Sequence, residues 1–224
     1  MEKIKFKYVL SIIFLVNTTV IVFFFKDLAI ELEYIFLPVF FTYFFIDSLT
    51  VIIPYMNDAV FSGKQFKKFL KALPDYSTEK LKQLKDKNNR IALLIFLIYF
   101  SFLTIIGILY LNIEAFSRFH MYVLFFVLNT ADYTCILIWC PFRSIFLKNK
   151  CCTTCRISNW DRIMKFYILF FIINPYTIGL GIIGVIVFLI WEYFHYANPE
   201  RFYQVSNYSL SCKECTDNFC KNKK

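Results

Sequence analysis

Long apolar segments recur along the chain and constrain its fold more than any other feature. A helix needs roughly 20 apolar residues to cross the hydrocarbon core of a bilayer. Such segments run over 8–25, 34–55, 91–111 and 121–140, and a longer apolar block covers 163–196. Apolar residues make up 58% of the 224 residues, more than a soluble domain of this size can bury. The sequence therefore predicts an all-helical protein that spans a membrane several times.

The last apolar block has two interpretations. It is long for one crossing and short for two, and Asn174-Pro175 lies in its middle. Asn-Pro is a turn signal, and proline removes a backbone donor from a helix. The block is therefore either one kinked helix or a tight hairpin, with a short fifth helix over 159–173 and a sixth over 178–194.

The distribution of basic residues favours the hairpin. Cytoplasmic loops of membrane proteins carry an excess of lysine and arginine. With a hairpin, all of the 25 basic residues except Lys26 and Arg118 lie on one side of the membrane. A single helix moves the basic residues of the tail to the other side. We therefore expect an inner-membrane protein with both termini in the cytoplasm, a bundle of six transmembrane helices over 1–198 and a cysteine-rich tail over 199–224.

The cytoplasmic loop over 56–90 is strongly basic. Between 61 and 73, aromatic and leucine side chains recur at helical spacing and lysines fill the other face. This pattern is typical of an amphipathic helix on anionic lipids, and a solvated basic loop is the alternative. We expect no nucleic-acid partner, since no segment has the pattern of a reader of base edges.

Six of the eight cysteines fall in two short polar segments, the cytoplasmic loop over 141–165 and the tail. Cys152 and Cys155 form one C-x2-C pair, and Cys212 and Cys215 form another. Two such pairs supply the four thiolates of a tetrahedral zinc site, and the hairpin returns the second pair to the side of the first. Two further thiols lie beside these pairs and are candidates for additional ligands: Cys151 and Cys220.

Other interpretations of these cysteines stay open. An iron–sulfur cluster also takes four thiolates. Transient thiol–disulfide chemistry is another alternative, and the thiols need not bind metal at all. Stable disulfides are disfavoured in a reducing cytoplasm.

Two carboxylates interrupt the apolar segments. Asp47 and Asp132 lie at similar depths in the second and fourth segments, and we expect them near the midplane, with Asn129, Asn17 and Cys135 in the same polar layer. Ionisable groups in a membrane span are costly and usually functional. The alternative is that they form hydrogen bonds between helices, with both aspartates protonated.

These patterns predict a membrane protein that binds or transports a small ion or metal, with zinc in the cytoplasmic cysteine site. The alternative from a different class is a membrane redox protein that uses an iron–sulfur centre or thiol–disulfide chemistry. A third interpretation is an intramembrane hydrolase that uses Asp47 and Asp132. The sequence leaves open whether the protein is an enzyme.

Overall fold

The computed structural model describes residues 2–53, 61–114, 116–148 and 154–211, and apart from one isolated β-bridge its regular structure there is helical. The long helices are α1 (Glu2–Phe24), α2 (Lys26–Ile52), α3 (Thr78–Asn112), α4 (Arg118–Leu137) and α6 (Pro175–Ala197). The short elements are the α-helix α5 (Asp161–Phe166), the π-helical turn η4 (Phe142–Phe146) and the 3-10 turns η2 (Phe61–Gln65), η3 (Lys67–Phe69), η6 (Arg156–Asn159), η7 (Tyr167–Phe171), η8 (Pro199–Arg201) and η9 (Tyr208–Leu210).

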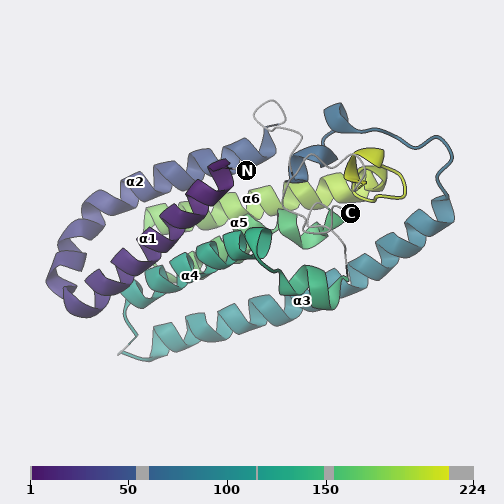
Figure 1. Ribbon diagram of the computed structural model, residues 1–224. Helices are drawn as coiled ribbons and strands as arrows, with labels where there is room; N and C mark the ends of the chain where they lie inside the picture. The colour runs from purple at the N-terminus through teal and green to yellow at the C-terminus, as the bar shows by residue number, and fades with distance from the viewer. Residues whose placement is uncertain (1, 54–60, 115, 149–153, 212–224) are drawn as a thin grey trace.

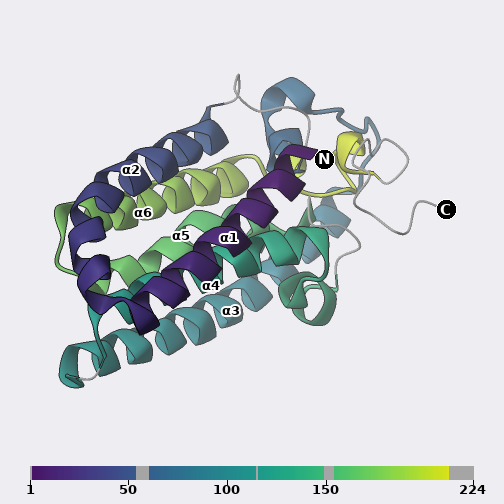
Figure 2. The same ribbon diagram turned by 60° about the vertical axis from the view of Figure 1, so that its left-hand side comes forward.

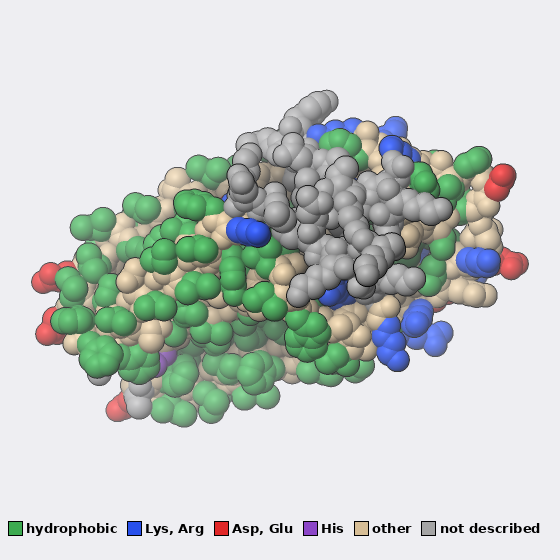
Figure 3. Space-filling view, in the orientation of Figure 1, with side chains coloured by type: hydrophobic (Ala, Val, Ile, Leu, Met, Phe, Trp, Pro, Cys, Tyr) green, Lys and Arg blue, Asp and Glu red, His purple; other side chains and the backbone are tan. Residues whose placement is uncertain are grey.

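The long helices run side by side in an elongated bundle (Figures 1 and 2). We call one end the N-terminal end, where α1 and α3 begin and α2, α4 and α6 end, and the other the far end. In the described part of the chain, five helices are long and apolar enough to cross a membrane. Apolar side chains cover much of the bundle in Figure 3, and lysines and arginines gather beyond them toward the N-terminal end. This is the architecture of a multi-pass membrane protein.

The hairpin block folds into one long helix and one short, irregular segment. Asn174 caps α6 by accepting a hydrogen bond of 2.9 Å from the Tyr176 N–H, and Pro175 occupies its first turn. The preceding segment is shorter than the expected helix over 159–173. It consists of α5 and η7, which together extend only about 19 Å. Its core side chains, Phe166, Ile168 and Leu169, have no exposed surface. The segment is therefore buried among the long helices.

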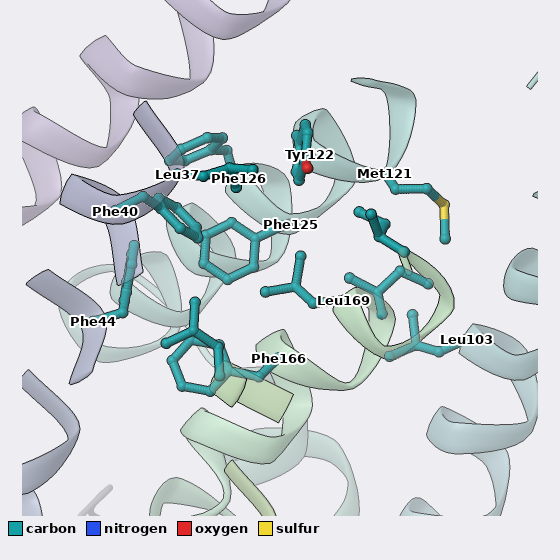
Figure 4. Close-up of a cluster of buried hydrophobic side chains, with 13 residues drawn as sticks. Leu37, Phe40, Phe44, Leu103, Met121, Tyr122, Phe125, Phe126, Phe166 and Leu169 are labelled. Carbon is teal, nitrogen blue, oxygen red and sulfur yellow. The ribbon is translucent and has the colours of Figure 1, made fainter. Parts of the chain in front are cut away.

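A cluster of aromatic and aliphatic side chains joins α5 to its neighbours (Figure 4). The rings of Phe125 on α4 and Phe166 on α5 stack with centroids 6.0 Å apart. Phe44 of α2 meets both rings edge-on. The close approach of α5 to α6 depends on Gly184, where a Cβ atom would lie 3.3 Å from the Arg162 carbonyl oxygen. Packing against three helices thus fixes the position of α5.

The amphipathic helix expected over 61–73 is not formed. The described residues there make the 3-10 turns η2 and η3 instead. Phe66 is buried against Trp191 of α6, and Lys64 and Gln65 are only 4% and 3% exposed. The helical spacing was misleading because this segment packs on the bundle. Phe66 and Lys64 are both buried there, so apolar and basic side chains do not separate onto two faces.

The tail covers this segment. Ala72 and Asn207 form an antiparallel bridge, and Asn207 is completely buried. Its side-chain amide donates to the carbonyl oxygens of Lys64 (3.4 Å) and Arg201 (3.0 Å). Its oxygen accepts from the backbone N–H of Lys71 at 3.3 Å. The beginning of the tail and the basic loop therefore form one cap on the N-terminal end of the bundle.

Candidate functional site

A cavity of about 430 Å³ opens at the N-terminal end of the bundle, below the ends of α2 and α4. Its wall also includes the first turns of α1, the turn η4 and the helix α5. Most of the lining is apolar, but it includes seven charged side chains: Lys7, Asp47, Asp132, Arg143, Asp161, Arg162 and Lys165.

Asp47 is held by two cations. One carboxylate oxygen accepts a hydrogen bond of 2.7 Å from Lys7 Nζ, and the other accepts one of 2.6 Å from Arg162. The side chains of Asp47 and Arg162 are 8% and 7% exposed. Arg162 also donates to the carboxylate of Asp161 beside it. Both oxygens of Asp47 are thus engaged by protein donors.

Asp132 is paired more loosely. Its nearest cation is Lys165, whose Nζ lies 3.8 Å from the carboxylate and 4.0 Å from that of Asp161. Among the described residues, Lys165 has one side-chain hydrogen bond, of 3.2 Å to Asn129 Oδ1. Lysine has three N–H donors, so Lys165 retains donor capacity at the cavity wall although it is only 1% exposed.

Sequence reasoning missed Arg162 and Lys165, the two buried cations of the site. It assigned both to the cytoplasmic loop and to the entry of the fifth helix. Their spacing of three residues places them on one face of α5, which turns toward α2 and α4. The sequence does hold a signal for them. Arg162 and Lys165 adjoin an apolar run that is too short to cross a membrane alone, and the carboxylates of Asp47 and Asp132, within apolar segments, require cations as partners.

The polar residues predicted for the midplane are only partly brought together. Asp47 and Asp132 line the same cavity, but each lies five residues before the end of its helix, about 7.5 Å along the axis. They are thus nearer to one end of the bundle than the sequence suggests. Asn129 contacts this group because its side-chain oxygen accepts the hydrogen bond from Lys165, and Cys135 lines the cavity. Asn17 lies on the exposed face of α1, away from this group.

Three cysteines are described, and all three line this cavity as thiols. Cys135 lies in the last turns of α4, Cys140 follows the helix, and Cys155 precedes η6. The pKa of the Cys140 thiol is lowered to about 6, chiefly because Cys135 donates a hydrogen bond to its sulfur. Burial opposes this effect, and the backbone N–H groups and charge of η4 add to it.

The predicted zinc ligands lie mostly outside the described residues. Cys155 is described and is 2% exposed. The remaining members of the predicted set fall on residues about which the structure says nothing: Cys151, Cys152, Cys212, Cys215 and Cys220. Within the described ranges there is no group of three or more histidine, cysteine or acidic side chains arranged to hold a metal ion.

A second cavity, of about 320 Å³, lies between α1, α2 and α4. It shares Lys7 and Tyr133 with the first cavity and includes Asn129, the partner of Lys165. It extends along α2 from Phe44 past Phe40 to Phe36, toward the far end. Its lining is almost entirely apolar, so the two cavities offer a charged compartment followed by an apolar one.

The arrangement limits what the carboxylates can do. A hydrolase that uses two aspartates needs both carboxylates close together and sharing a proton. Asp47 is instead compensated by Lys7 and Arg162. Asp132 and Lys165 form a looser pair than Asp47 and Arg162, so a ligand or a proton can exchange at Asp132 with less loss of contacts.

Comparison of the chain with protein-family models, with curated proteins and with solved structures finds no match. The cavity and its charged residues are therefore the evidence on function.

Proposed function

We propose that the protein is a membrane transporter that binds a small organic carboxylate in the charged cavity and carries it together with a proton. In this proposal the chain crosses the membrane six times, with the buried segment of α5 and η7 as the short fifth crossing. The N-terminal end of the bundle faces the cytoplasm.

The observation that carries the proposal is the state of Lys165. This ammonium group is buried, lies at the cavity wall and makes one hydrogen bond, to Asn129, within the described structure. Burial of a charge is costly unless the charge is compensated. The carboxylates of Asp132 and Asp161 stand off at 3.8 and 4.0 Å, so a carboxylate ligand has room to approach the free donors directly.

Asp132 supplies the coupling to protons. While the cavity is empty, its negative charge compensates Lys165 across 3.8 Å. A bound carboxylate takes over this role and places a second negative charge beside Asp132. Protonation of Asp132 relieves the repulsion between them, since a neighbouring like charge favours the neutral form of a carboxyl group. Anion binding and proton uptake therefore promote each other.

The apolar cavity supports the next step. A carboxylate that has received the proton is neutral, and a neutral weak acid enters an apolar compartment at far lower cost than an anion. The cavity between α1, α2 and α4 begins beside Lys7 and Tyr133 and is lined beyond them by phenylalanines. It gives the neutral acid a route toward the far end.

The orientation rests on charge. The described basic residues gather around the N-terminal end of the bundle, while Lys26 and Arg118 lie at the far end. An excess of basic residues marks the cytoplasmic side. In this orientation the charged cavity opens to the cytoplasm.

Transport by purified protein in liposomes tests the proposal. With radiolabelled lactate and a pH-sensitive dye inside, we expect lactate uptake accompanied by internal acidification. Lys165→Met should abolish both, because the carboxylate loses its donor. Asp132→Asn should retain lactate binding, measured as a rise in the melting temperature, but should uncouple uptake from the pH gradient.

The matched control is Lys82→Gln, which removes an exposed lysine on α3 outside the cavity. It should transport like the parent. Uptake by Lys165→Met at the parental rate, or no uptake of lactate, pyruvate or benzoate by the parent above that of empty liposomes, would contradict the proposal.

The zinc site over Cys152, Cys155, Cys212 and Cys215 stays a separate proposal. Metal analysis and an absorption spectrum of anaerobically purified protein test it. One equivalent of zinc without colour supports it, whereas iron with visible charge-transfer bands supports the iron–sulfur alternative. Contact of the basic loop over 61–73 with anionic lipids also stays a proposal, and it now rests on exposed lysines rather than on an amphipathic helix.

A further inference from the structure

The wall of the charged cavity holds a pair of thiols that the proposed transport does not use. Cys135 and Cys140 both line the cavity, one before and one after the end of α4. We propose that they form a dithiol site that reduces small disulfides, with Cys140 as the attacking thiolate and Cys135 as the resolving thiol. This inference stands independently of the transported solute.

The chain geometry at the end of α4 brings the two thiols together. The carbonyl oxygen of Thr134 accepts hydrogen bonds from the N–H groups of both Ile138 (2.9 Å) and Trp139 (3.1 Å). The last turn is thereby widened, and Cys140 leaves the helix while it still lines the same cavity as Cys135. The carbonyl of Cys140 is fixed in turn by Ser144, whose N–H and hydroxyl donate to it at 3.0 and 2.7 Å.

The surroundings of Cys140 favour its thiolate. The backbone N–H groups of Phe142 and Arg143 donate to its sulfur, and the guanidinium of Arg143 adds positive charge. The pKa of this thiol, lowered to about 6, makes it mostly ionised at neutral pH. The thiolate is the nucleophilic form of cysteine. Cys140 is 7% exposed, so a disulfide would have to reach it through the cavity.

The chemistry is a two-electron exchange with a disulfide R–S–S–R. The Cys140 thiolate attacks one sulfur of R–S–S–R; the R–S–S–R bond breaks, a mixed disulfide forms and RS⁻ leaves. Cys135 then attacks the Cys140 sulfur and transfers its proton to the departing group, which leaves as RSH. The Cys135–Cys140 disulfide is the oxidised product. Because both thiols line the same cavity at the end of α4, a local movement there brings them to an S–S bond of about 2.05 Å.

Peptide mass spectrometry of the purified full-length protein tests this inference. Trypsin cuts after Arg118 and Arg143, and the peptide between them contains Cys135 and Cys140 and no other cysteine. After treatment with glutathione disulfide, we expect this peptide to lose two hydrogens. Cys135→Ser should instead accumulate a stable glutathione adduct on Cys140, and Cys140→Ser should form neither product.

Lys82→Gln is the control, because Lys82 is exposed on α3 outside the cavity. It should form the disulfide as the parent does. In iodoacetamide labelling, the rate at Cys140 should reach half of its maximum near pH 6. The inference is overturned if the peptide stays reduced in glutathione disulfide, if Cys140→Ser forms an adduct on Cys135 as fast as the parent reacts, or if half-maximal labelling of Cys140 lies near pH 8.5.

Discussion

Arg162 donates a hydrogen bond of 2.6 Å to the carboxylate of Asp47, although 115 residues separate the two in the chain. The pair joins the end of α2 to the short helix α5, and both side chains are more than nine-tenths buried. By comparison, the ammonium group of Lys165, on the same helix, stays 3.8 Å from the carboxylate of Asp132. The ion pair between α2 and α5 is therefore tighter than the one between α4 and α5.

Arg162→Gln should destabilise the protein by about 3–5 kcal/mol, because it leaves the buried carboxylates of Asp47 and Asp161 without their shared cation. Thermal unfolding in detergent measures the effect. Lys82→Gln, at an exposed position on α3, is the control and should leave the melting temperature unchanged. An equal melting temperature for the two variants would show that this pair contributes no stability.

Gly184→Val should destabilise the bundle by about 1–3 kcal/mol through overpacking. A Cβ at Gly184 would lie 3.2 Å from a ring carbon of Phe166 and 3.3 Å from the carbonyl oxygen of Arg162, so branches added to it would push α5 away from α6. The same displacement should weaken lactate binding, because α5 carries Lys165. Ile186→Val, at a position 47% exposed on the same helix, is the control for both readouts. If Gly184→Val is as stable as the parent, α5 can move away from α6 without cost, and the prediction is wrong.

Asn207→Ala should open the cap on the N-terminal end of the bundle. The alanine leaves the carbonyl oxygens of Lys64 and Arg201 and the N–H of Lys71 without their partner, a loss of about 1–3 kcal/mol. Hydrogen exchange should accelerate over 61–73 and over the tail. Asn112→Ala removes an exposed amide that bonds within its own helix, and it should change neither segment. Unchanged protection in Asn207→Ala would place the stability of the cap elsewhere.

Cysteine labelling should place the turn before α6 outside the cell. Ile173 is 92% exposed at the far end, and Lys82 is exposed on α3 at the other end. In a background with the eight native cysteines changed to serine, Ile173→Cys should react with a membrane-impermeant maleimide in intact cells. Lys82→Cys should react only after permeabilisation. The reverse pattern would invert the topology and place the charged cavity outside.

The long helices were predictable because hydropathy depends only on composition along the chain. The end points of the apolar segments over 91–111 and 121–140 fall within α3 and within a few residues of the ends of α4. The short fifth segment was harder, since its α-helical part ends after Phe166 and a 3-10 turn follows. Packing on neighbouring helices, and not local propensity, stabilises such a segment.

The sequence predicts the aspartates of the candidate site but not the cations. Asp47 and Asp132 stand out because charge is rare within apolar segments. Asn17 misled, because both faces of α1 are apolar and the sequence does not indicate which face meets the protein. The sequence alone indicates loop positions for Arg162 and Lys165, since a cation beside an apolar run usually marks the membrane surface. Only the tertiary arrangement places them against the aspartates.

The short length of α5 and η7 has a consequence for biosynthesis. An 11-residue segment with Arg162 and Lys165 in its first turns is too short and too charged to enter the lipid phase by itself. In the proposed six-span topology, this segment therefore enters the bilayer only together with α6. The cations then find Asp47 and Asp132 already in place, because α2 and α4 are synthesised first. In that topology, membrane integration is complete only when α6 has entered, and a nascent chain released before α6 leaves Asp47 without Arg162 and Asp132 without Lys165.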